Sequence, residues 1–143
     1  HRKKFDVVLL TDVLEHLCDP LRVLAWVKTH LSKGGQIFIS IPNVAFITVR
    51  LNLLRGRFDS TKFGIMDETH VKFYTKKSLQ KLLQQSGLTI INWDYVGNFT
   101  QLPSYLQTLD PWVGKKIWWR NFEYFLTKKM PESLAVQFIV SCQ

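Results

Sequence analysis

The sequence has few of the features that mark secreted, zinc-ribbon or membrane-spanning proteins. Only two of its 143 residues are cysteines, Cys18 and Cys142, so neither a disulfide framework nor a Cys-x-x-Cys metal site is expected. No apolar stretch approaches the roughly 18 residues that a spanning helix requires. The amino terminus shows no signal-peptide pattern either. We therefore expect a protein of the reducing cytoplasm.

What the sequence does contain is an ordinary globular composition with an excess of positive charge. Apolar residues make up 46% and charged residues 21% of the chain, and 143 residues are enough for one domain with a buried core. The formal net charge of +8 favours an anionic partner such as nucleic acid, a phosphorylated substrate or a membrane surface. The lysines and arginines occur in pairs and triplets rather than in one block. This pattern favours a solvated basic surface, and nucleic acid is not the expected partner.

The first third of the chain predicts a strand, a helix and a second strand. Within the apolar run from Phe5 to Leu10, the residues Val7-Val8-Leu9-Leu10 show no polar alternation, which predicts a strand of a parallel sheet that is covered on both faces. The strand is expected to reach about Thr11. Asp19 and Pro20 predict a helix start, and apolar residues recur at helical spacing up to the glycines 34–35. A second strand is expected over 36–41. Strand, helix and strand in this order form a right-handed βαβ unit.

The rest of the chain predicts two more helices and two more strands around an aromatic-rich insertion. Helices are expected over 44–54 and after Thr75, and a strand over 88–96. The alternation of apolar and polar side chains in 134–141 predicts an antiparallel strand towards the edge of the sheet. Residues 98–131 are too many for a bare loop, so helices are expected within this insertion. Its aromatic residues include Trp112, Trp118, Trp119, Phe122, Tyr124 and Phe125.

Three ionisable residues follow the first strand, namely Asp12, Glu15 and His16. Ligands of open α/β sheets lie outside the carboxyl ends of the strands, so these residues are candidates for chemistry. Their i, i+3, i+4 spacing would place all three on one face of a helical turn. Each also has a purely structural interpretation, because acidic residues near a helix start gain from the helix dipole and a histidine there can bond a backbone group.

Four short motifs of the chain are informative as a combination. They are Phe5-Asp6-Val7-Val8, Asp12-Val13-Leu14-Glu15-His16-Leu17-x-Asp19-Pro20, Ile41-Pro42-Asn43, and Gly64-Ile65-x-Asp67-x-Thr69-His70-Val71-Lys72-Phe73-Tyr74-Thr75. The first three together resemble the second half of class I S-adenosylmethionine-dependent methyltransferases. The fourth is similar to a bacterial subgroup whose members are thought to methylate sugars or other small metabolites.

The resemblance implies a partial Rossmann-like α/β fold with flanking helices. In the family order 3-2-1-4-5-7-6, this chain would supply strands four, five, six and the antiparallel strand seven. The family's glycine-rich cofactor loop has no counterpart in this chain, because the seven glycines form no Gly-x-Gly pattern. Residues 1–143 are therefore expected to be the carboxyl-terminal half of a methyltransferase domain, with an insertion at about 98–131.

The same resemblance implies a cofactor, an acceptor and residue roles. S-adenosylmethionine would be the cofactor, and the acceptor would be a small polar or glycan-type molecule. His16 would act as the base, and Glu15 would orient it or bind a substrate hydroxyl. The residues expected along the methionine end of the cofactor are Thr11, Asp12 and Val13. The residues expected to face the acceptor are Asn43, His70 and Tyr74.

A divalent metal is not expected, although one alternative includes it. Asp12, Glu15, His16 and His70 together resemble the ligands of metal-dependent small-RNA 2′-O-methyltransferases, and such ligands would suit Mn²⁺ or Mg²⁺. The segment around His70 matches the metal-free sugar-type subgroup at least as well.

Two further alternatives concern partners. Without the first three strands of the family's sheet, residues 5–10 would form a long apolar edge that can pair with another chain, so a non-catalytic, self-associating piece is a third interpretation. The basic and aromatic stretch 115–129 is typical of membrane-surface helices, although packing in a core or a dimer is the favoured interpretation of its aromatic residues.

Overall fold

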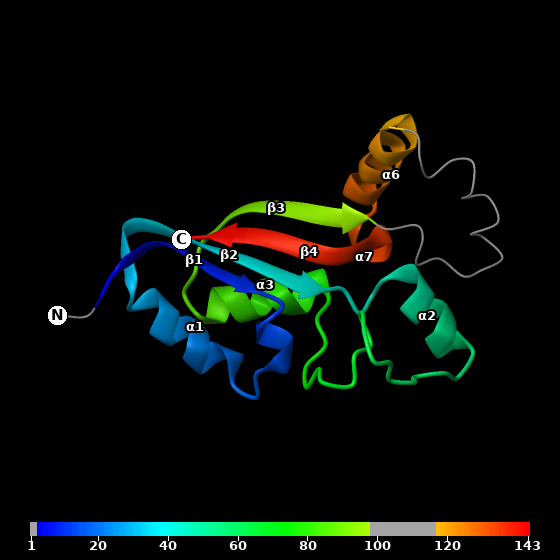
Figure 1. Cartoon of the computed structure of the whole chain (residues 1–143), viewed down its shortest axis with the longest axis horizontal. Helices are drawn as coiled ribbons and strands as arrows, with labels where there is room; N and C mark the ends of the chain where they lie inside the picture. Colours follow the sequence, from blue (N-terminus) through cyan, green and yellow to red (C-terminus); the bar gives the residue numbers. More distant parts are fainter. Residues whose placement is uncertain (1–2, 98–116) are drawn as a thin grey trace.

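A mixed four-stranded sheet organises the chain (Figure 1). The computed structural model describes residues 3–97 and 117–143, and only the backbone of 117–120. The strands are β1 (Phe5–Thr11), β2 (Leu31–Pro42), β3 (Ile90–Gly97) and β4 (Ala135–Cys142), in the order β1-β2-β4-β3. β1 and β2 are parallel, and β4 is antiparallel to both of its neighbours. The antiparallel final strand is thus confirmed, but it lies inside the sheet and not towards its edge.

Two helices cover one face of this sheet (Figure 1). α1 (Pro20–Lys28) connects β1 to β2, and it begins where predicted because Asp19 caps it: its carboxylate accepts a hydrogen bond from the Arg22 backbone N–H at 3.1 Å. α3 (Lys76–Gln85) begins with a capping box between Thr75 and Ser78.

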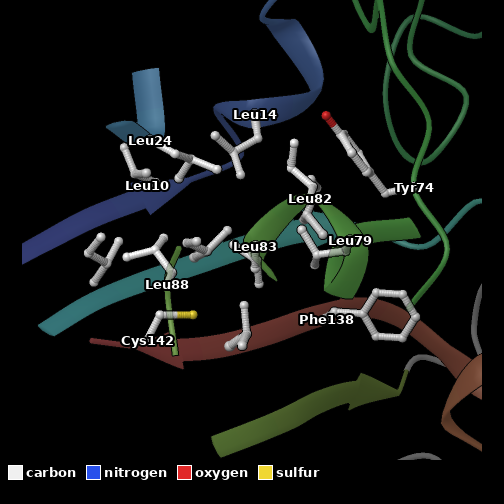
Figure 2. Close-up of a cluster of buried hydrophobic side chains, with 14 of the residues drawn as sticks. Leu10, Leu14, Leu24, Tyr74, Leu79, Leu82, Leu83, Leu88, Phe138 and Cys142 are labelled. Carbon is white, nitrogen blue, oxygen red and sulfur yellow. The ribbon is translucent and has the colours of Figure 1, made fainter. Parts of the chain in front are cut away.

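The buried core lies between these helices and the sheet (Figure 2). Leucines of α1 and α3 point towards the strands, and Leu14 closes the core near the end of β1. The fully buried residues of this core are Leu14, Leu24, Ile37, Ile39, Ile41, Leu79, Leu83, Ala135, Phe138, Val140 and Cys142. This core fixes the position of the carboxyl end of β1.

The exposure of one face of β1 differs from the sequence-based prediction. Leu10 is buried and Val8 is half-buried on the core face, whereas Val7 and Leu9 are 55% and 64% exposed. The prediction of a strand covered on both faces is wrong, because β1 is the edge of the described sheet and no described element packs on that face. The prediction of an apolar strand at the edge is confirmed.

The helix before β2 is shorter than predicted, and β2 is longer. α1 ends at Lys28, and β2 already begins at Leu31, which pairs with Phe5. Gly34 adopts a left-handed φ of +82°, and a Cβ on Gly35 would lie 3.0 Å from the Phe5 carbonyl oxygen. The two glycines therefore allow the irregular pairing of β2 with β1 at this point, and they do not end a helix.

Three α-helices and a short 3-10 turn complete the described residues. They are η1 (Leu14–His16), α2 (Ile47–Leu54), α6 (Ile117–Lys129) and α7 (Pro131–Leu134). α6 confirms the expectation of helix within the insertion, while Trp112 and the side chains of Trp118 and Trp119 lie outside the described residues. None of the helices seen in the structure has the length and apolar character needed to cross a bilayer.

Candidate functional site

A cavity of about 330 Å³ opens beyond the carboxyl end of β1. It lies where the sequence predicted a ligand site, at the ends of the parallel strands. Four separate segments form it: the turn after β1, the end of β2 at Pro42, the loop that begins at Gly64, and the start of β4. Its polar lining consists of Asp12, Glu15, His16, Asp67, His70 and Gln137.

Hydrogen bonds fasten η1 to the loop that carries His70. The Glu15 carbonyl oxygen accepts hydrogen bonds from the backbone N–H groups of Val71 and Lys72, at 2.9 and 3.0 Å. The His16 imidazole bonds the Thr69 carbonyl oxygen at 3.1 Å. As a result the rings of His16 and His70, which are far apart in the sequence, lie edge to face with their centroids 4.9 Å apart.

The same contacts fix which nitrogen of each histidine can accept a proton. His16 Nδ1 faces the Thr69 carbonyl, and His70 Nδ1 faces the Ile65 carbonyl at 3.1 Å. A carbonyl oxygen can only accept, so Nδ1 must carry the hydrogen in both rings. In the neutral form Nε2 of each ring is then left with a lone pair, which can take a proton or bind a cation.

Glu15 is the most unusual group of the site. Its side chain is 1% exposed, and neither carboxylate oxygen has a hydrogen-bond partner among the residues that the structure describes. Burial raises the pKa of Glu15 above its ordinary 4.5, and the neighbouring Asp12 carboxylate adds to this, whereas the Glu15 backbone N–H, and then the charges of His70 and His16, oppose it. A buried carboxyl without donors is costly, so this group is suited to a ligand that brings donors or positive charge.

Asp12 occupies a strained backbone position at the end of β1. Its φ of +52° is the one left-handed value among the described residues other than glycine. The Asp12 carboxylate accepts a hydrogen bond from the Gln137 amide at 2.6 Å, and this amide also bonds the Ser40 hydroxyl at 3.2 Å. The turn after β1 is thereby joined by side-chain hydrogen bonds to β4 and β2.

Two polar residues of the site were not predicted from the sequence. Gln137 comes from the antiparallel strand, and only its polar character within an apolar alternation could have singled it out. Asp67 accepts hydrogen bonds from the Thr69 hydroxyl at 2.6 Å and the Thr69 backbone N–H at 2.8 Å. The hydroxyl, and then the N–H, hold the pKa of Asp67 below its usual range. The Asp-x-Thr spacing was a usable signal for this turn.

Asn43 and Tyr74 are not among the residues that line the cavity. Asn43 is fully buried, donates hydrogen bonds to the carbonyls of Glu132 and Ala135, and accepts one from the Ala45 N–H. Its side chain therefore holds the end of β2 against the start of β4. Tyr74 belongs to the core cluster of Figure 2, where burial, and then the charge of Glu15, raise the pKa of its hydroxyl to about 12.

The expected cofactor residues lie at the tip of β1 with differing exposure. Thr11 and Asp12 are exposed, and Asp12 lines the cavity. Val13 is half-buried against the core. Asp12, Glu15 and His16 all line the cavity, but they do not share one helical turn, because Asp12 precedes η1 and has a left-handed φ. Glu15 is buried, whereas the other two side chains are exposed.

A different set of three residues offers its ligand atoms to one point. One such atom each from Glu15, His16 and His70 lies within 4.8 Å of the other two. A divalent cation about 2.0–2.3 Å from each atom would require separations below roughly 4.6 Å. A slight closure of these side chains would thus let them hold one ion, without Asp12.

Known proteins match the chain over its first two thirds and resemble its fold. A family model described as "Methyltransferase domain" matches residues 1–93. A tRNA U34 carboxymethyltransferase from Campylobacter fetus subsp. fetus is 32% identical over 89 residues, covering 48% of this chain and 31% of that protein. A ubiquinone biosynthesis O-methyltransferase from Aromatoleum aromaticum is 28% identical over 88 residues, covering 62% of this chain and 38% of the relative.

Solved structures confirm the expected partial Rossmann-like α/β fold. The crystal structure of a SAM dependent methyltransferase from Archaeoglobus fulgidus superposes with a TM-score of 0.57 at 15% identity, covering 99% of this chain and 60% of the other. At that identity the likeness shows the fold alone. The chain spans about a third of the length of the curated relatives that it matches.

The buried carboxyl predicts an unusual dependence of stability on pH. Because the pKa of Glu15 is higher in the folded than in the unfolded chain, the folded state binds this proton more tightly. The free energy of unfolding should therefore fall as pH rises from about the ordinary 4.5 through the raised pKa. The variant Glu15→Gln lacks this titration and should be the more stable protein above that window.

Urea unfolding of both proteins between pH 4 and 8 measures this difference. Glu68→Gln, at an exposed glutamate, is the matched control and should follow the wild type. Parallel pH profiles for wild type and Glu15→Gln would show that the carboxyl is not destabilised by burial.

Proposed function

We propose that this chain, which belongs to the methyltransferase-domain family, supplies the acceptor side of a methyl-transfer site. The cofactor of the family is S-adenosylmethionine, and the proposed acceptor is a hydroxyl group of a small polar or glycan-type molecule. The observation that carries the proposal is the cluster of Glu15, His16 and His70 around one cavity at the end of β1. The O-methyltransferase among the relatives supports oxygen as the methylated atom.

Methyl transfer requires the protein mainly to align the two reactants and to accept a proton. S-adenosylmethionine supplies an already activated methyl group, so the acceptor oxygen must be aligned with it and must lose its proton. His16 Nε2 is the proposed base, because the bond from Nδ1 to the Thr69 carbonyl leaves Nε2 with the lone pair. The Glu15 carboxyl, which lacks partners in the described structure, accepts a second hydroxyl of the acceptor and stabilises the resulting imidazolium.

The tip of β1 fits the amino-acid end of the cofactor. Asp12 is exposed, lines the cavity and holds its carboxylate at the rim through Gln137, so it can receive an ammonium group there. Thr11 and Val13 flank it on the same backbone. Because the chain has no Gly-x-Gly loop, we place residues 1–143 as the carboxyl-terminal half of a methyltransferase domain, which other chain segments complete on the cofactor side.

Replacement of the proposed base tests this function. In the completed methyltransferase domain, His16→Ala should lower the rate of methyl transfer from S-adenosylmethionine by about 10²–10⁴-fold, the usual contribution of a positioned base. Binding of S-adenosylhomocysteine, measured by calorimetry, should change little. The matched control is His30→Ala, because His30 lies after α1 and its ring bonds the Trp26 carbonyl. Equal rates for the two variants would remove His16 from the mechanism.

The same cluster favours a second candidate function, metal-assisted methylation of an RNA hydroxyl. Two imidazole nitrogens and one carboxylate oxygen within 4.8 Å form a donor set that accepts Mn²⁺, and a cation would satisfy the buried Glu15 carboxyl. The carbonyl partners of His16 and His70 would orient both rings, as outer partners of metal ligands do. The net charge of +8 suits an RNA acceptor.

A titration with Mn²⁺ or Mg²⁺ separates the two candidates. Under the metal-free proposal neither cation changes binding or rate, and chelation by EDTA has no effect. Under the metal-assisted candidate, Mn²⁺ binds to the wild type, and His70→Ala weakens that binding by about tenfold or more. Asp67→Asn is the control, since Asp67 lines the cavity but does not belong to the three-residue cluster.

Self-association through β1 is the third proposal. Its support is the edge position of β1 together with the exposure of Val7 and Leu9. Light scattering of the wild type should show dimers or larger species at micromolar concentration. Leu9→Lys should shift the protein towards monomer, because a charge on an edge strand opposes pairing. Ile91→Lys, on the opposite edge strand β3, is the matched control; a monomeric wild type would contradict the proposal.

A further inference from the structure

We propose that the segment 52–63 is a docking surface for an anionic membrane surface. This segment, the α2 tip, comprises the carboxyl end of α2 and the loop that follows it. Every one of its residues is exposed. It nevertheless carries four large apolar side chains, whose exposed fractions are 48% for Leu53, 83% for Leu54, 58% for Phe58 and 85% for Phe63.

Such a concentration of exposed apolar side chains is unusual for a soluble surface. Single exposed leucines are common and need no explanation, but four large apolar side chains exposed within one short segment favour an interaction site. Phe63 and Leu54 are the two most exposed of the large apolar residues that the structure describes. Phe58 extends the patch towards the site, because its ring contacts that of Phe73 edge to face, with the centroids 5.9 Å apart.

The charges of the α2 tip identify the kind of partner. Arg55, Arg57 and Lys62 lie among the apolar residues, and Asp59 is the single acidic residue of the segment. No ion pair of these three cations is found within the described part of the chain. Basic side chains interspersed with leucine and phenylalanine match the interfacial region of a bilayer, where apolar groups enter the acyl boundary and cations meet anionic headgroups. The leucines Leu53 and Leu54 favour a bilayer over a nucleic acid, because bases stack on aromatic rings and guanidinium groups and not on aliphatic side chains.

The position of the α2 tip lets it reach a flat surface. α2 projects at one end of the molecule, away from the sheet and from α1 (Figure 1). The base of this projection is held by a small second core of Phe46, Val49 and Ile65, so the tip is presented by a packed element. Ile65 also lines the cavity, which would place the acceptor site beside the membrane. The inference goes beyond the proposed function and does not depend on it, because binding to vesicles needs neither cofactor nor acceptor.

Sedimentation with lipid vesicles tests the docking surface. The chain should bind vesicles of phosphatidylglycerol and phosphatidylcholine, and bind pure phosphatidylcholine vesicles at least about tenfold more weakly. The double variant Leu54→Glu, Phe63→Glu should lose about tenfold or more in affinity for the anionic vesicles, because it removes apolar side chains and adds negative charge. Both positions are exposed, so the variant should stay folded, and its circular dichroism spectrum should match that of the wild type.

Two controls make the outcome decisive. Trp26→Glu changes a residue of α1 that is 61% exposed, and it should retain vesicle binding. Arg55→Ser, Arg57→Ser should remove the preference for anionic vesicles. The inference is overturned if the wild type binds neither kind of vesicle, if Trp26→Glu loses as much affinity as the double variant, or if the α2 tip variants abolish binding of RNA or self-association while vesicle binding is unchanged.

Discussion

The site depends on the hydrogen bonds that join η1 to the segment 69–72. Glu15 contributes its carbonyl oxygen to two of them, and His16 contributes its ring to a third. The backbone bonds turn the Glu15 side chain into the protein, and the side-chain bond selects the tautomer of His16. One set of contacts therefore determines the burial of the carboxyl, the proton-accepting nitrogen of the imidazole and the approach of His70. Loss of this arrangement would separate the three groups even if the sheet stayed intact.

A buried carboxyl beside two imidazoles lowers the stability of the fold, but it suits a site that binds a ligand or transfers a proton. The core would gain from an apolar residue at position 15, since the carboxylate has no donors within the described structure. The conflict is confined to the carboxyl end of β1, where Asp12 also holds a strained backbone conformation. Departures from the rules of good packing concentrate where a ligand can compensate for them. That concentration distinguishes this cavity from an ordinary surface hollow.

Local sequence signals predicted the helices and strands well. They could not predict the contacts between segments that are distant in the sequence. The apolar run of β1, the Asp19-Pro20 helix start and the Thr75 cap each act over a few residues, and each was found in place. Asn43 carries no such signal, because its role is to bond carbonyls some ninety residues away in the sequence. The extra length of β2 was missed for the same reason. The helical spacing of the apolar residues extends to Leu31, but Leu31 pairs with Phe5 of β1 and is therefore part of the strand. Glu15 and His16 were found because position at a strand end is itself a local feature.

Two of the exposed apolar surfaces in the described part of the chain, β1 and the α2 tip, have different physical characters. On β1 the exposed side chains alternate along a strand whose outer backbone groups have no partner strand in the described sheet, so the surface suits another strand and offers directional hydrogen bonds. On the α2 tip the apolar side chains stand on a helix end and a loop among arginines and a lysine, so no regular backbone edge is offered. A protein strand satisfies the first surface and cannot satisfy the second. A fluid, negatively charged interface satisfies the second, because it adapts to an irregular shape and supplies charge without requiring register.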